Sequence, residues 1–399
     1  MIWNELTRPR GLHWGSVPGI IRHSLGPLDL RRPLHVFLCL ADHYEPLRGG
    51  ASISVQRERV ARWVREYPRS VAGLADSRGR SPQHTFFYPA EEYVPEHLEA
   101  MAGLCRAGHG DVDVHLHHDN DCSDRLRETL ESFKEILFHR HGLLARSPAG
   151  QITYGFIHGN WALDNSRPDG RWCGVNDELS ILRETGCYAD FTMPSAPNPC
   201  QTRTINSIYY ARDDRARPNS HDRGTASQRG VTPADDALLM IQGPLLLGWK
   251  RQGWRVSPAL ENGELHGGRP PTLARFKRWL RAGVGVVGTS DWIFIKLHTH
   301  GALERNAEML LGEPMRQFHY SLAQFARRRP ALNYYYVTAR EMAGLVRQAE
   351  QGGNARLLSH EDRAYGAGRG AYLKPVFACR LKSMGRVCPG HVQCLTKEI

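Results

Sequence analysis

Short apolar or β-rich runs alternate with helical patterns along most of this 399-residue chain, and this alternation constrains the fold more than any other feature. Seven such runs stand at residues 33–41, 84–89, 111–118, 152–158, 187–193, 237–244 and 292–300. Parallel strands need a crossover connection, which is usually a helix. The order therefore predicts an α/β fold with parallel strands, either a barrel or an open doubly wound sheet.

Two segments interrupt this alternation. Residues 203–232 are rich in Asp, Arg and Ser, which favours an insertion or lid after the fifth strand. Residues 351–399 are basic and Gly-rich without a sustained period, so we expect a disordered tail. We expect an N-terminal extension at 1–32 and a single main domain at 33–350.

Charge and cysteine content restrict the partners that we expect. A net charge of +11 would suit an anionic partner, but the Arg residues are interspersed with acidic ones and no nucleic-acid-binding motif accompanies them, so nucleic acid is not expected. Nine cysteines without C-x-x-C spacing argue against a disulfide scaffold and a structural zinc module. No signal peptide or transmembrane segment is recognisable, and we expect a cytoplasmic protein.

Polar side chains follow several of the predicted strands. They are Asp42, His43 and Glu45; Tyr88, Glu91 and Glu92; His115, His117, His118, Asp119 and Asp121; His158, Asn160 and Trp161; and Lys296, His298 and His300. Because the carboxyl ends of parallel strands converge on one side of an α/β fold, histidines from different strands should meet there. The sequence therefore predicts a divalent metal site.

Strand alternation ranks these candidates. His115 and His117 share one face of the third strand, opposite Val114, and His298 and His300 share a face of the last strand. His117 and His298 lie nearest the strand ends and are the strongest candidates. His115 is one layer deeper, where it would support a ligand rather than bind the metal.

The motifs "ADHYE" after the first strand, the histidine cluster after the third and "KLHTH" in the last resemble those of NodB-type polysaccharide deacetylases, carbohydrate esterase family 4. The resemblance implies a distorted (β/α)7 barrel. It assigns Asp42 as general base and His43 to the metal, in place of the family's second Asp. It maps the family's histidine pair onto His117 and Asp121, with His118 and Asp119 as alternatives, and the general acid onto His298. The family's arginine-proline motif is absent, and "HGNW" occupies its place.

The implied reaction is deacetylation of an N- or O-acetylated sugar in a polysaccharide or glycoconjugate. A divalent metal, with zinc as the first choice and manganese, cobalt or iron also suitable, would polarise the carbonyl and activate water. Asp42 would take up the proton of that water and His298 would protonate the leaving group. The expected substrate-binding residues are Glu45, Tyr88, His158, Asn160, Trp161 and His300.

Two other functions stay open. The H-x-H pairs "HLH" and "HTH" are also typical of metal-dependent phosphoesterases and amidohydrolases. Alternatively, because His43 replaces the second Asp, the chain could be a non-catalytic, deacetylase-like protein that binds glycan.

Overall fold

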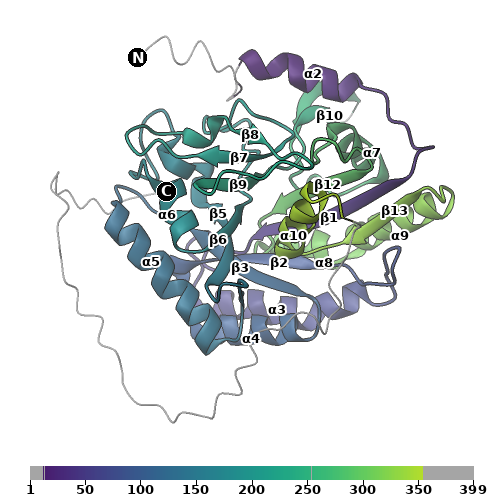
Figure 1. Ribbon diagram of the computed structural model, residues 1–399. Helices are drawn as coiled ribbons and strands as arrows, with labels where there is room; N and C mark the ends of the chain where they lie inside the picture. Colours follow the sequence, from purple (N-terminus) through teal and green to yellow (C-terminus); the bar gives the residue numbers. More distant parts are fainter. Residues whose placement is uncertain (1–11, 13, 253, 354–399) are drawn as a thin grey trace. The chain divides into compact units, whose positions relative to one another are not determined.

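The computed structural model describes residues 12, 14–252 and 254–353 of the chain. It has a mixed α/β fold built on a large, mostly parallel sheet (Figure 1). Seven strands coincide with the predicted runs: β1 (Leu34–His43), β2 (His84–Pro89), β3 (Gly110–Leu116), β5 (Ile152–His158), β6 (Cys187–Asp190), β9 (Ala237–Ile241) and β12 (Trp292–Thr299). They lie in the order β12-β1-β2-β3-β5-β6-β9, and every neighbouring pair is parallel, which confirms the predicted strand direction.

Six further strands lie outside the seven predicted runs. They are β4 (Ala145–Arg146), β7 (Ile208–Arg212), β8 (Thr225–Ala226), β10 (Leu246–Gln252), β11 (Arg255–Glu261) and β13 (Leu332–Tyr336). β7 and β8 fall within residues 203–232 and extend the sheet antiparallel from β9, whereas β10 and β11 form a separate two-stranded sheet. Within the described residues, no ladder joins β8 or β9 back to β12, so closure of the sheet into a barrel is not detected.

Helices connect most of the strands. They are α2 (Val17–Leu25), α3 (Ile53–Val71), α4 (Pro95–Arg106), α5 (Ser123–Glu135), α6 (Glu178–Glu184), α7 (Leu273–Ala282), α8 (Glu304–Leu311), α9 (Glu313–Arg327) and α10 (Ala339–Glu350). Single helical turns are η2 (Trp14–Ser16), η3 (Ala90–Glu92), η4 (Ile136–Arg140), η5 (Gly159–Trp161), η6 (Leu163–Asn165) and η7 (Ser220–Asp222). Local sequence sets some ends: Thr338 and Glu341 form a capping box at the start of α10, and Gly283 ends α7 in the left-handed region.

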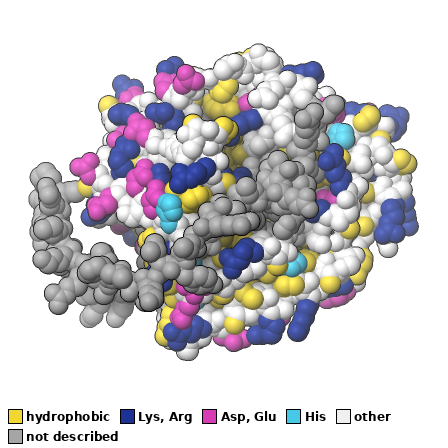
Figure 2. All heavy atoms as spheres, turned by 60° about the horizontal axis from the view of Figure 1, so that its bottom comes forward, with side chains coloured by type: hydrophobic (Ala, Val, Ile, Leu, Met, Phe, Trp, Pro, Cys, Tyr) yellow, Lys and Arg dark blue, Asp and Glu magenta, His cyan; other side chains and the backbone are white. Residues whose placement is uncertain are grey.

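The structure describes only part of each terminal segment. α2 lies within the expected extension at 1–32, and residues 354–399 of the expected tail lie outside the described residues. None of the helices in the described part of the chain is both long and apolar enough to cross a bilayer. On the face seen in Figure 2, basic side chains are scattered among acidic and apolar ones.

The strands separate two apolar cores. The first core joins Val112, Val114 and Leu116 of β3 to α3, α4, α5 and α9. The second core joins Phe37 of β1 and Phe294 of β12 to α10. Figure 1 shows α3 and α4 beside β2 and β3, and α10 next to β1. Successive side chains of a strand therefore enter different cores, and this alternation also decides where the polar residues beyond the strand ends lie.

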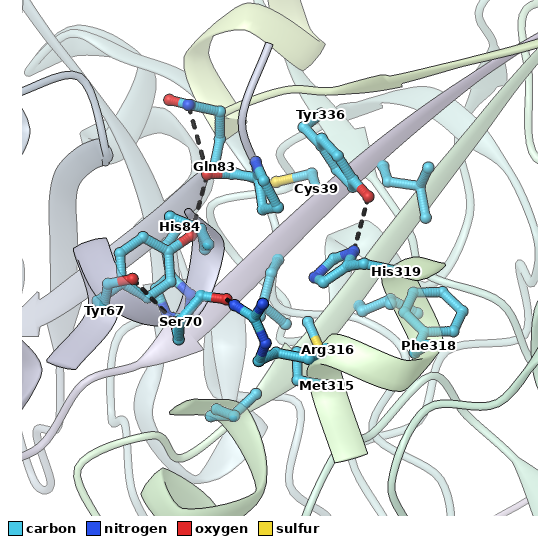
Figure 3. A pocket seen from close by; sticks show the side chains of 16 residues that line it. Cys39, Tyr67, Ser70, Gln83, His84, Met315, Arg316, Phe318, His319 and Tyr336 are labelled. Carbon is cyan, nitrogen blue, oxygen red and sulfur yellow. Dashed lines mark hydrogen bonds between the residues drawn. The ribbon is translucent and has the colours of Figure 1, made fainter. Parts of the chain in front are cut away.

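A cavity of about 40 Å³ lies in the first core between β1, α3 and α9 (Figure 3). Its lining is largely apolar, but His319 also faces it. Nδ1 of His319 lies 2.6 Å from the hydroxyl of Tyr336. The cavity is therefore part of the packing between helices and sheet, on the side of β1 that carries Leu38 and Leu40.

Candidate metal centres

Two groups of metal-ligand side chains lie at the carboxyl ends of the parallel strands. The open cluster consists of Glu45, His115 and His117, and the closed cluster consists of His118, His158, Cys173 and Glu178. In each group the potential ligand atoms all lie within 4.8 Å of one another. Residue groups that could hold a metal ion are therefore present, as the sequence predicted, although their composition differs from the expected one.

Glu45 is the centre of the open cluster. Its Oε1 lies 3.0 Å from Nε2 of His117 and 3.4 Å from Nε2 of His115. Its Oε2 lies 3.0 Å from Nδ1 of His300 and accepts a hydrogen bond from Arg48. Glu45 follows β1, His115 and His117 lie at the end of β3, and His300 follows β12, so three strands of the sheet supply the group.

Each imidazole of the open cluster is oriented by a second contact. Nδ1 of His115 donates to the carbonyl of Ile157 at 2.7 Å, and its Nε2 faces Oε1 of Glu45, where it could bind a cation. Nδ1 of His117 lies 2.6 Å from Oε1 of Glu91. Histidine ligands of metals commonly make this kind of outer hydrogen bond, because it fixes the tautomer and the ring orientation. The donor set therefore fits a divalent cation.

The open cluster is accessible from one side. The side chain of His117 is 28% exposed, whereas that of Glu45 is 3% exposed and that of His115 is buried. A catalytic metal site keeps a position for water or substrate, and a structural site is closed by its protein ligands. The exposure of His117 therefore leaves room at this cluster for water or another ligand.

The charged forms of Glu45 and His117 in the open cluster stabilise one another. Burial would raise the pKa of Glu45, but hydrogen bonds from His115, His117 and His300 hold it well below its usual value. Burial would lower the pKa of His117, but hydrogen bonds to Glu45 and Glu91 raise it to about 9. Without a cation, a protonated His117 thus offsets the carboxylate charge, and a bound cation would displace that proton.

Two more aromatic side chains line the open cluster. The ring of His43 lies 4.8 Å from that of His300 and 5.0 Å from that of His115, measured between centroids. The indole of Trp161 lies 6.1 Å from the ring of His43, and its buried Nε1 has no hydrogen-bond partner among the described residues. Trp161 also has a φ of 58°, unusual for a bulky residue and typical of backbone held under strain at functional sites.

The closed cluster lies on the other side of the strands. His118 follows β3, His158 ends β5, Cys173 lies in the loop before α6, and Glu178 is the first residue of α6. Nε2 of His118 is 3.3 Å from Oε1 of Glu178, and Nε2 of His158 and Sγ of Cys173 are 3.6 Å and 3.4 Å from its Oε2. The side chain of His118 is 7% exposed and those of His158 and Glu178 are 0% exposed, so solvent has little access.

The structure does not bring Asp42, the expected base, to either cluster. Asp42 lies on the first-core side of β1, fully buried, where Oδ2 contacts Nε2 of His84 at 2.9 Å and Oδ1 accepts from the backbone N–H of Gly301 at 2.6 Å. The expected metal ligands His117 and Asp121 are also separated, because Asp121 contacts His118 at 3.0 Å.

The expected acid, His298, is fully buried on the side of His43, and the two ring centroids are 6.2 Å apart. Burial, with Lys296 nearby, holds the pKa of His298 well below its usual value, so it is neutral at pH 7. Among the expected substrate-binding residues, Glu45, Trp161 and His300 lie at the open cluster, and Asn160 is next to Trp161 in η5.

The other two expected substrate-binding residues lie elsewhere. Tyr88 is buried in the first core and donates to the carbonyl of Glu92, and His158 belongs to the closed cluster. Two contributors were missed as potential ligands: Cys173 and Glu178. Neither Cys173 nor Glu178 directly follows a strand, so only the path of the chain between β5 and α6 brings them to the closed cluster.

No family model matches this chain, and no curated protein is significantly similar to it. The geometry of the two clusters is therefore the basis for assigning a function.

Proposed function

We propose that the protein is a metal-dependent hydrolase that removes acetyl groups from N- or O-acetylated sugars, with the open cluster as its centre. The observation that carries the proposal is the meeting of Glu45, His115 and His117 at the carboxyl ends of parallel strands, with His117 reaching solvent. One carboxylate and two imidazoles with an accessible position form a donor set typical of catalytic zinc, and cobalt, manganese or iron would also suit it.

The same proposal includes the fold of the NodB-type deacetylases, a distorted (β/α)7 barrel. Its support is the contact between the chain that follows β9 and the end of β12. The N–H of Leu265 donates to the carbonyl of His298 at 2.8 Å, and the N–H of His298 donates to the carbonyl of Gly263 at 3.2 Å. A Cβ at Gly243 would lie 2.5 Å from the carbonyl oxygen of Lys296. A barrel that closes through irregular backbone would bring the two edges of the sheet together without a continuous ladder of hydrogen bonds between strands.

The bound ion would polarise the acyl carbonyl and lower the pKa of water toward neutrality. The protein's own residues hold the ligands: Ile157 and Glu91 orient His115 and His117, and Arg48 balances part of the Glu45 charge. This environment keeps the ligand atoms of the two imidazoles directed at one point beside Glu45.

In this proposal His300, rather than Asp42 or His298, transfers the proton. His300 is in contact with Glu45, and its side chain is 11% exposed, so it can reach both the cluster and a substrate. An imidazole in this position can accept a proton from one group and return it to another. Asp42 has both oxygens engaged on the first-core side, and His298 is enclosed.

Trp161 supports a sugar as the substrate. Its indole stands next to His43 and His300, and it combines an apolar face with an N–H that lacks a partner among the described residues. An indole of this kind can pack against the C–H face of a sugar ring and donate to one of its hydroxyls.

The test is hydrolysis of N-acetyl and O-acetyl oligosaccharides, with a phosphoester panel alongside, by the zinc-loaded wild type and by Glu45→Gln and His115→Gln. We expect acetate release by the wild type and its loss in both variants. His139→Gln is the matched control, because His139 is an exposed histidine that pairs with Glu135 and belongs to neither cluster. Hydrolysis of phosphoesters alone would replace the proposal by a phosphoesterase. Glycan binding without hydrolysis and without metal would replace it by a non-catalytic binding protein.

A further inference from the structure

The closed cluster has the ligands of a second metal site, and the open cluster and the proposed reaction do not use it. Its four side chains come from four separate places in the chain: the end of β3, the end of β5, a loop and the start of α6. We infer that His118, His158, Cys173 and Glu178 bind a structural zinc ion that fixes the loop between β5 and α6.

The distances suit tetrahedral coordination. Nitrogen, oxygen and sulfur ligands at their usual bond lengths from zinc would be roughly 3.3–3.6 Å apart. The contacts of Glu178 with His118, Cys173 and His158 measure 3.3, 3.4 and 3.6 Å. These contacts, which involve both carboxylate oxygens of Glu178, are close to the separation that a bound ion would require, and the four ligand atoms all lie within 4.8 Å of one another.

Both imidazoles have an outer partner that directs the Nε2 atom into the cluster. Nδ1 of His158 donates to the carbonyl of Gly159 at 2.5 Å, so its buried Nε2, which has no hydrogen-bond partner in the described part of the chain, points at Glu178 as an acceptor. Nδ1 of His118 lies 3.0 Å from Asp121, and this carboxylate–histidine pairing is common behind metal ligands.

Two backbone donors would stabilise Cys173 as a thiolate once a cation is bound. The backbone N–H groups of Asn165 and Val175 both point at Sγ, at 3.3 and 3.4 Å. Two donors directed at one buried sulfur stabilise a negative charge on it. A thiolate, a carboxylate and two neutral imidazoles then balance a divalent ion, which matters because an unbalanced charge in an enclosed site is costly.

The backbone around the cluster explains what the ion would do. Asn160, Trp161, Asp164 and Asn165 in the loop all have positive φ values, from 50° to 58°. Such a segment persists only where its surroundings hold it. The ion would tie this loop, which presents Trp161 to the open cluster, to the ends of β3 and β5.

Cobalt substitution separates this site from the open cluster, which contains no cysteine. The full-length wild type loaded with Co²⁺ should show a thiolate-to-cobalt charge-transfer band, and the zinc-loaded protein should hold one more equivalent of zinc than Cys173→Ala. Cys105→Ala is the matched control, because Cys105 is also a buried, free cysteine. It should keep both the band and the metal content.

A second variant covers the case in which Cys173→Ala does not fold. Cys173→Asp retains an anionic ligand, so it should keep the zinc equivalent and lose the charge-transfer band. His117→Gln should keep the band, whatever happens to metal at the open cluster. If Cys173→Ala or Cys173→Asp shows an unchanged band, or if the wild type shows none, the inference is overturned, while the proposed hydrolase activity stands or falls separately.

Discussion

His117 and His118 are neighbours in the sequence, yet their side chains belong to different clusters. His117 contacts Glu45 and Glu91, whereas His118 contacts Asp121 and Glu178. The backbone leaves β3 at Leu116 but continues to point successive side chains to opposite sides. A short histidine-rich segment thereby serves an accessible group on one side and an enclosed group on the other.

Substitution of these two neighbours should have different effects. Loss of an outer partner of a metal ligand lowers activity roughly 10–100-fold. His117→Gln removes a ligand itself, so we expect it to lower acetate release by more than this, with little change in stability. We expect His118→Gln to lower the free energy of unfolding by about 2–4 kcal/mol, because it leaves the buried Glu178 with one contact fewer. Thermal unfolding and acetate release, measured on both variants, give the comparison. Equal losses of stability would contradict the separation of the two clusters.

Asp42 should behave as a structural residue. Asp42→Ala removes the acceptor of the Gly301 N–H and the partner of His84, and we expect it to lower the free energy of unfolding by about 2–4 kcal/mol. Asp42→Asn keeps an acceptor for Gly301 and should retain most of the hydrolytic activity at a temperature where it is folded. Complete loss of activity in a folded Asp42→Asn would instead support the role of general base that the sequence predicted.

His319 should make stability depend on pH. Burial, with Arg316 nearby, lowers the pKa of His319 from 6.5 to about 3. Below pH 6.5 the unfolded chain takes up a proton that the folded protein does not bind, so folding loses up to about 1.4 kcal/mol per pH unit until the folded pKa is reached. Stability is therefore full above pH 6.5 and falls with acidification.

The control for this pH effect is His319→Gln, which can still contact Tyr336. Denaturant unfolding between pH ~4.5 and ~7 should show a shallower loss of stability for the variant than for the wild type, because other titrating groups are common to both. Parallel pH profiles would contradict the prediction.

Removal of one member of the buried pair Glu261–Arg275 should lower the stability more than replacement of both members. Two hydrogen bonds join them, at 2.8 and 2.9 Å, and Arg275 also donates to the carbonyl of Glu264. We expect Arg275→Met to lower the free energy of unfolding by about 3–5 kcal/mol, since it leaves a buried carboxylate without its main partner. The double variant Arg275→Met with Glu261→Leu should recover part of that loss in urea denaturation. A double variant less stable than the single one would show that the two charges are not coupled.

The parallel strands could be predicted from the sequence because each is a compact apolar run followed by helix. The short strands β7, β8 and β13 lie outside the seven predicted runs: β7 lies in a largely polar segment and pairs with β9, β8 pairs with β7, and β13 pairs with β1. Local pattern carries little information about such long-range pairing.

Part of the site could have been predicted from the same alternation of side chains that ranked the histidines of β3. Applied to β1 and β2, it places Asp42 and Tyr88 on the first-core side and Glu45 with His43 on the other. Applied to β5, it places His158 with His118. Cys173 and Glu178 could not be found this way, since they follow a loop whose path depends on tertiary contacts.

The pairing of β1 has a consequence for synthesis of the chain. His35 pairs with Trp292 in β12, and Leu34 pairs with Leu332 in β13, so this early strand finds two of its three neighbours almost at the end of the described residues. During translation β1 is complete long before those partners leave the ribosome, and an apolar strand with bare edges is prone to pair with other chains. Chains cut short before β12 should therefore aggregate or engage chaperones, while the full-length chain folds late and slowly.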